Sequence, residues 1–138
     1  MNISLSNCFV TVHDPDEALK FYRDALGLEV RSDVESHGFR WVTLSPPAQP
    51  DVQIVLSPTH PGREADGDTI LALLTKGSLN GVNFVTDDLD GTFEKVRASG
   101  AEVLQEPMDQ FWGQRDCAFR DPSGNMVRIG QARQARNA

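Results

Sequence analysis

Two stretches of the chain show the same order of apolar and polar residues. Residues 7–30 and 80–103 superimpose without a gap, and the match places Asn7 on Asn80 and Gly27 on Gly100. Each stretch begins with alternating residues, which is the pattern of a strand with two different faces. Apolar residues then recur every three or four positions, which predicts a helix with one buried side. A repeat that spans about half of the chain indicates two copies of one structural unit.

Both predicted helices have recognisable starts. In the first copy we expect Asp14 to cap the helix, with Pro15 at the first helical position and Glu17 completing a capping box. In the second copy we expect Asp87 to be the cap, and a glycine follows each helical pattern as a stop signal. The apolar stripes consist of Ala18, Phe21, Tyr22, Ala25 and Leu26 in the first helix and of Leu89, Phe93 and Val96 in the second.

Three strands are expected after each helix. The alternation predicts strands at 28–34, 39–44 and 51–56 in the first copy and at 102–106, 115–120 and 126–130 in the second, with a type I turn at 121–124. We therefore expect one structural domain made of a first βαβββ module (1–56) and a second (80–130). Residues 57–79 are expected to be a linker with a short helix that Asp68 caps and Gly77 ends, and residues 131–138 a frayed tail.

The charge of the chain narrows the classes of partner. Twenty acidic residues against 13 basic residues give a net charge of −7. Nucleic acids and anionic membranes bind basic surfaces, so neither is an expected partner. The acidity is compatible with neutral or cationic ligands, although solubility alone is sufficient to explain it. No apolar run reaches the roughly 20 residues of a membrane span, and no secretory signal opens the chain, so we expect a cytoplasmic protein.

Two cysteines, Cys8 and Cys117, lie at or near apolar positions of predicted strands. Two isolated cysteines form no zinc motif. We expect both to be buried thiols, and the pattern leaves a disulfide between them open.

Two signatures in the chain resemble a known superfamily. The first is V-x-D-x-x-x-A-x-x-F-Y-x-x-x-L-G at residues 12–27, and the second is the turn Asp-Pro-Ser-Gly-Asn at residues 121–125. Together with the repeat, they resemble the vicinal oxygen chelate superfamily, which includes glyoxalases, bleomycin resistance proteins and extradiol dioxygenases. The resemblance implies an α+β fold in which two tandem βαβββ modules form curled mixed sheets around a cleft. It also implies a homodimer that binds small molecules.

The resemblance further implies four positions that hold a divalent metal in the enzymes of the superfamily. Here they correspond to Asn7, Asn80, Arg128 and a residue of the 51–56 strand. The resemblance indicates Gln53 for that residue, whereas the repeat indicates Val55. Amide oxygens are poor substitutes for imidazole or carboxylate ligands, and a guanidinium has no lone pair to give. We therefore expect neither a metal nor another cofactor.

The histidines offer no alternative metal site. His13 is expected to serve the corner between the first strand and the first helix, and His37 and His60 are expected in solvated loops. A displaced site that uses Asp51 remains a second possibility.

The resemblance also implies which residues line the cleft. Arg128 has two possible roles there, which are to clamp an anionic group of a ligand or to pair with an internal acid. Phe39 and Trp41 offer flat surfaces for an aromatic ligand, with core packing as the alternative for Trp41. The expected ligand-binding residues are Asn7, Phe9, Asp51, Gln53, Asn80, Phe84, Phe111, Trp112, Met126 and Arg128, and the same strand faces carry Thr11, Val55 and Val82.

These features favour a small-molecule-binding protein, similar to bleomycin resistance proteins, with a degenerate site that binds an aromatic or cationic compound without metal. The alternative is an enzyme of the glyoxalase or dioxygenase type, a lyase, isomerase or oxygenase, that uses a displaced divalent metal. In that case Asp51 is the candidate for acid–base catalysis. A third possibility is a structural or regulatory dimer with a vestigial cleft.

Overall fold

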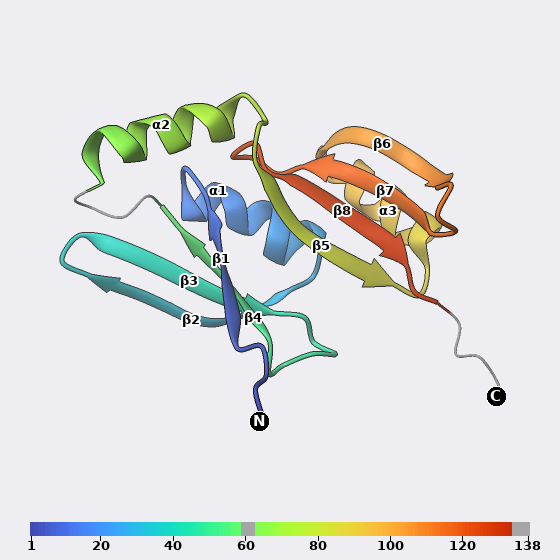
Figure 1. Cartoon of the computed structure of the whole chain (residues 1–138), viewed down its shortest axis with the longest axis horizontal. Helices are drawn as coiled ribbons and strands as arrows, with labels where there is room; N and C mark the ends of the chain where they lie inside the picture. The colour runs from blue at the N-terminus through green and yellow to red at the C-terminus, as the bar shows by residue number, and fades with distance from the viewer. Residues whose placement is uncertain (59–62, 134–138) are drawn as a thin grey trace.

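The structure is a computed structural model, and it describes residues 1–58 and 63–133 of the chain. Two mixed sheets of four strands occupy opposite sides of the view in Figure 1, one from each half of the chain. The first sheet has the strand order β1-β4-β3-β2, with β1 parallel to β4 and the other neighbours antiparallel. Its strands are β1 (Asn7–Thr11), β2 (Glu29–Ser36), β3 (Phe39–Ser45) and β4 (Gln53–Ser57).

The second sheet repeats this topology with the order β5-β8-β7-β6 and with β5 parallel to β8. Its strands are β5 (Asn80–Thr86), β6 (Glu102–Asp109), β7 (Arg115–Arg120) and β8 (Met126–Gln131). The helices are α1 (Pro15–Leu19), its π-helical continuation η1 (Lys20–Ala25), α2 (Glu64–Thr75) and α3 (Leu89–Ala98). The predicted α+β fold of two tandem βαβββ modules is confirmed, and neither sheet closes into a barrel.

The core forms where the helical stripes meet the sheets. All the stripe residues predicted from the sequence are buried except Leu26, which is half-buried against the same cluster. One hydrophobic cluster contains residues of both modules, including Val10 and Tyr22 from the first and Phe93 and Ile129 from the second. Each buried aliphatic or aromatic side chain contributes roughly 1.5 to 3 kcal/mol, so this shared core holds the modules together.

The ends of the helices agree only in part with the sequence signals. Asp14 caps α1 as expected and accepts a hydrogen bond from Asp16 N at 2.9 Å. Glu17 accepts from Lys20 Nζ at 2.9 Å, so its carboxylate serves an ion pair on the helix surface. In α3 the cap is Asp88 and not Asp87, because the Asp88 side chain accepts from Gly91 N at 3.1 Å.

The linker and the last strand of the first module also differ from the prediction. Helix α2 begins at Glu64, so Asp68 lies inside the helix and does not cap it. β4 begins at Gln53, which leaves Asp51 in the preceding turn. At the C-terminal end Gln131 belongs to β8, and its side chain bonds to Leu89 N and to Asp87 O. His60 and the tail from residue 134 lie outside the described residues.

The predicted turn between β7 and β8 is confirmed by a hydrogen bond of 3.1 Å from Gly124 N to Asp121 O. The Asp121 side chain is 3% exposed, and its Oδ1 accepts from the backbone N–H groups of Ser123, Gly124 and Asn125. The Asn125 side chain donates to Asp121 Oδ2 and to Thr11 O in the first module. This turn therefore connects the two modules.

None of the helices in the described part of the chain has the length and hydrophobicity that a bilayer-spanning helix requires.

Candidate functional site

β1 pairs with β4 in the same way as β5 pairs with β8, but a bulge in β5 changes which side chains share a face. Asn7 lies opposite Gln53, and Asn80 lies opposite Met126. An irregularity between Asn80 and Asn83 then places Phe84 opposite Ile129, a core residue. Since Met126 and Ile129 lie on opposite faces of β8, Asn80 and Phe84 also lie on opposite faces of β5. The expected alternation of Asn80, Val82 and Phe84 is therefore interrupted.

A cavity of about 580 Å³, here called the neutral pocket, lies between β1 and β5. Four of the expected ligand-binding residues line it, namely Phe9, Gln53, Asn80 and Phe84. None of the described residues that line it is charged. The polar part of the lining is rich in amide residues, namely Gln49, Gln53, Asn80 and Asn83, together with Asn125, whose NH₂ is already bonded to Asp121 and Thr11. Its apolar walls and convergent amides are typical of a site for an uncharged small molecule.

A second cavity of about 330 Å³, here called the aromatic pocket, shares Phe9 and Thr11 with the neutral pocket. Phe39, Trp41 and Arg63 also line it. The ring centroids of Phe9 and Trp41 are 6.2 Å apart, and those of Phe39 and Trp41 are 5.2 Å apart. Phe9 is 63% exposed and Trp41 is 37% exposed, so both rings offer surface to a ligand. Of the two roles considered for Trp41, the structure supports a ring that faces a cavity.

Arg128 pairs with an internal acid, and that acid is Asp116. Its Nη1 lies 3.2 Å from Asp116 Oδ2 and 3.0 Å from Gln105 Oε1. The other carboxylate oxygen of Asp116 accepts from Gln105 and Gln110, each at 2.8 Å. Burial alone would raise the pKa of Asp116, but the hydrogen bonds from Gln110 and Gln105 and the charge of Arg128 outweigh it and hold the pKa below its ordinary value.

No signal in the sequence pointed to Gln105 and Gln110. They belong to no motif, and Gln110 lies beyond the end of β6 in a loop. The bulges that shift the β6–β7 register bring Gln105 opposite Ala118 and Met108 opposite Asp116. Only those irregular pairings bring the two glutamines to the Asp116 carboxylate.

The residues at the metal positions of the superfamily do not fit a divalent metal. Three of the four positions carry the amides of Asn7, Gln53 and Asn80, and the pairing of the strands sets Asn7 beside Gln53. Such groups are weak ligands for the metals that superfamily enzymes use, and Arg128 is a cation already bonded to Asp116. Among the described residues no three His, Cys, Asp or Glu side chains come together to hold a metal. Asp51, the candidate for a displaced site, is exposed in a turn.

The other expected ligand-binding residues lie outside the neutral and aromatic pockets. Asn7 is exposed, and its amide donates to Ser6 Oγ at 3.3 Å. Phe111 and Trp112 lie in the loop between β6 and β7, 96% and 51% exposed, with ring centroids 4.8 Å apart. Together with Asp51, Met126 and Arg128, they line neither cavity. Their contact with a ligand stays a prediction.

The two cysteines are both free, and they differ in exposure. Cys117 is fully buried, and burial, together with the charge of Asp116, raises the pKa of its thiol to about 11. Cys8 is exposed and lines the neutral pocket. The expectation of a buried thiol is therefore correct for Cys117 and wrong for Cys8, because the β1 face that carries Cys8 extends past the helix-covered core.

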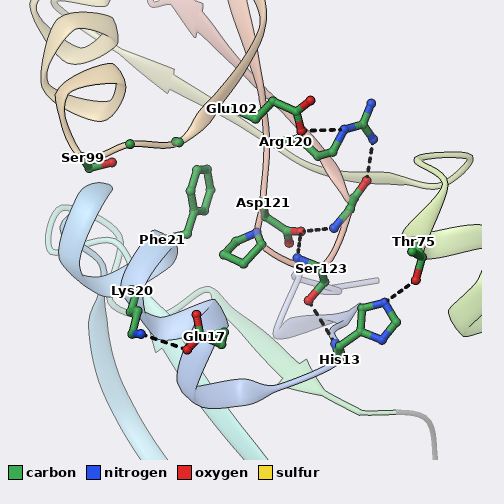
Figure 2. Close-up of a pocket in the computed structure, with 14 residues that line it drawn as sticks. His13, Glu17, Lys20, Phe21, Thr75, Ser99, Glu102, Arg120, Asp121 and Ser123 are labelled. Carbon is green, nitrogen blue, oxygen red and sulfur yellow. Dashed lines mark hydrogen bonds and ion pairs between the residues drawn. The ribbon is translucent and has the colours of Figure 1, made fainter.

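A third cavity, of about 460 Å³, lies between α1, the end of α3 and the turn between β7 and β8 (Figure 2). Its charged side chains are already paired, since Lys20 bonds to Glu17 and Arg120 lies 3.2 Å from Glu102. His13 sits at the corner between β1 and α1, as expected, and its Nε2 is 2.8 Å from Thr75 Oγ1. These internal pairs leave the third cavity with weaker ligand-binding chemistry than the other two.

Comparison with known proteins places the chain in a family. Residues 4–129 match the model of the glyoxalase/bleomycin resistance protein/dioxygenase superfamily. The uncharacterized protein YurT of Bacillus subtilis (strain 168) is 31% identical over 134 residues, which are 95% of this chain and 99% of YurT.

Two solved structures resemble the fold closely. The structure of UcmS2 has a TM-score of 0.87 and 30% identity, and the alignment covers 96% of this chain and 100% of UcmS2. TnmS3, an antibiotic binding protein from Streptomyces sp. CB03234, has a TM-score of 0.76 and 28% identity, with 96% and 99% of the two chains covered. The chain therefore belongs to the glyoxalase/bleomycin resistance protein/dioxygenase superfamily.

Proposed function

We propose that this protein binds an aromatic small molecule without a metal, in the cleft that the neutral and aromatic pockets form on either side of Phe9. The observation that carries the proposal is the lining of the two cavities, which share Phe9 and Thr11 and combine exposed rings with uncharged amides. A flat ligand gains stacking contacts with Phe9 and Trp41, and the amides of the neutral pocket bond to its polar edge.

The lining favours aromatic over cationic ligands. A buried cation needs a carboxylate or a ring of electronegative groups to replace its water. Among the described residues, neither cavity has an aspartate or a glutamate in its lining. The buried Asp116 is already bonded to Arg128 and two glutamines. An uncharged ring system therefore fits the neutral pocket better than a positively charged one.

TnmS3 supports a binding role, since it is an antibiotic binding protein of the same fold that is 28% identical to this chain. A homodimer belongs to the same proposal. The described strands leave apolar side chains open to solvent, with Phe9 63%, Val34 47% and Val85 67% exposed. A second copy that covers these strands would remove that apolar area from water and enclose the ligand. The cytoplasmic location expected from the sequence is also part of the proposal.

The test is ligand-induced thermal stabilisation with fused-ring aromatic amides, starting with 2-naphthamide. The melting temperature of the wild type should rise, since a ligand at 100 times its dissociation constant adds roughly 2.7 kcal/mol to the free energy of unfolding. Phe9→Ala should lose most of this stabilisation. Met108→Ala is the control, because it removes an exposed apolar side chain that lines neither cavity. Equal stabilisation of Phe9→Ala and the wild type, or none for any neutral aromatic compound, would overturn the proposal.

A further inference from the structure

We infer that Arg63 selects aromatic ligands that carry an anionic group, which it binds in the aromatic pocket. The inference rests on the proposed binding function and adds a chemical class to the ligand. It begins from the position of Arg63, the residue directly before α2, which lines the aromatic pocket together with Phe9, Phe39 and Trp41. Two strands of the first module and the start of the linker helix thus bring three rings and one guanidinium to a single cavity.

The Arg63 guanidinium has no ion pair or hydrogen bond with any of the described residues, unlike those of Arg40 and Arg128. Arg40 bonds to Asp33 through two nitrogens and to Asp16 through a third contact. Arg128 bonds to Asp116. None of the described residues therefore occupies the donors of Arg63, which can bond to a ligand. A planar guanidinium with open donors matches a carboxylate in a two-pronged arrangement.

The surroundings of Arg63 do not supply a competing carboxylate within the pocket. Glu64 and Asp66 lie in the first turn of α2, but neither lines the aromatic pocket. Arg63 also makes no side-chain cap for α2, so the first N–H groups of the helix add positive potential on the same side.

The net charge of −7 does not exclude an anionic ligand. Charges on a protein surface are screened over roughly 8 Å at physiological salt, so the nearest cation dominates the field inside a small cavity. The rings of Phe9 and Trp41 hold the ligand by contact area, and Arg63 then discriminates by charge. The sequence suggested Arg128 as the residue that binds an anionic group of the ligand, and we infer that Arg63 has this role instead.

The experiment compares two ligands of nearly the same shape, 2-naphthoate and 2-naphthamide, by calorimetric titration of the full chain. The wild type should bind the carboxylate about fivefold more tightly than the amide, which is the upper end of the gain from a charge pair with an exposed arginine. Arg63→Gln should abolish this preference, because it should lower the affinity for the carboxylate more than the affinity for the amide. Lys76→Gln is the matched control, because it removes the same charge at the other end of α2 and Lys76 lines none of the three cavities.

The outcomes separate this inference from the proposed function. If 2-naphthamide binds but 2-naphthoate binds no more tightly, the inference is wrong and the binding function stands. A carboxylate preference that survives in Arg63→Gln, or that falls equally in Lys76→Gln, also overturns it. If neither compound binds and no aromatic compound stabilises the protein, both proposals fail.

Discussion

The hydroxyl of Tyr22 donates a hydrogen bond of 2.6 Å to Asp121 Oδ2, and this bond joins the helix of one module to the last turn of the other. Both residues belong to the motifs that mark the superfamily in the sequence. Tyr22 is fully buried and Asp121 is 3% exposed, so the bond is made where water cannot replace it. The two sequence motifs therefore contact each other directly in the folded protein.

Replacing Tyr22 with phenylalanine should lower the free energy of unfolding by about 1 to 3 kcal/mol, because a buried carboxylate oxygen loses a donor. Urea unfolding at neutral pH measures the change. Ser32→Ala is the control, since it removes a hydroxyl that bonds to Thr43 at an exposed site and should change the stability very little. Equal effects of the two substitutions would show that the Tyr22 contact does not hold the modules together.

Tyr22 is the only tyrosine of the chain, so its ionisation can be followed by ultraviolet absorbance. Burial, followed by the charge of Asp121, raises the pKa of its phenol above the ordinary value of 10.0. Above pH 10.0 the phenol therefore stays protonated in the folded state, whereas the unfolded state releases the proton. The contribution of Tyr22 to the free energy of unfolding should be fully present below pH 10.0 and should fall as the pH rises above that value. The tyrosinate signal should appear only together with unfolding, and a reversible signal near pH 10.0 in the folded protein would contradict the structure.

Asp116→Asn should destabilise the protein by roughly 2 to 4 kcal/mol at neutral pH, because it leaves Arg128 without its counter-ion. The pKa of Asp116 lies below the ordinary 3.8, so its stabilising effect is present above pH 3.8 and is lost as the pH falls through the pKa of the folded state. Urea unfolding at several pH values should show the difference from the wild type shrinking in acid.

The control for this prediction is Asp33→Asn. Hydrogen bonding to Arg40 also lowers the pKa of Asp33, but that pair is exposed and should contribute little to stability. If both substitutions lower the free energy of unfolding by the same amount, the buried Asp116–Arg128 pair does not stabilise the protein more than an exposed pair does.

Only one of the two thiols should react with a soluble disulfide reagent in the folded protein. Cys8 is exposed, whereas Cys117 is buried with a pKa of about 11 and therefore has little thiolate at neutral pH. Absorbance of the released chromophore should show one fast thiol, and a second after denaturation. Cys8→Ser should remove the fast reaction. Two fast thiols in the wild type would contradict the burial of Cys117.

Divalent metals should not stabilise the protein. At the positions where superfamily enzymes hold their metal, Zn²⁺, Ni²⁺, Mn²⁺ and Fe²⁺ would meet the amides of Asn7, Gln53 and Asn80 and the guanidinium of Arg128. Elemental analysis after metal exposure should give far less than one metal per chain, with no rise in melting temperature. The reverse result, near-stoichiometric metal and a raised melting temperature, would favour the enzyme alternative.

Much of the fold could be predicted from the sequence, because burial follows the period of a helix or a strand. Phe93 and Val96 are buried as their spacing requires, and the turn after Asp121 forms as its proline and glycine indicate. The predictions fail where a local hydrogen bond decides which of two adjacent residues caps a helix. Asp87 and Asp88 are equally good caps in a sequence, and only the bond to Gly91 distinguishes them.

The candidate site was less predictable, because it depends on register and on loops. The bulge between Asn80 and Asn83 has no signature in the alternation of β5, yet it turns Phe84 away from the face of Asn80. Arg63 lies in a linker whose conformation no motif defines, so nothing in the sequence connects it with Phe9 and Trp41. The Arg128–Asp116 pair itself spans the regular β7–β8 pairing, in which Arg128 lies opposite Ala118, but the two glutamines that join it depend on the irregular β6–β7 register and on the loop after β6.

The two modules use the same strand face in different ways. In the first, that face carries open rings around Phe9, and in the second it is occupied by the pair of Asp116 and Arg128. Side chains around Phe9 can therefore change without breaking a buried ion pair, whereas those beside Arg128 cannot. Laboratory evolution toward other compounds should accumulate its changes among the pocket-lining residues of β1, β3, β5 and the start of α2, and spare Asp116 and Arg128.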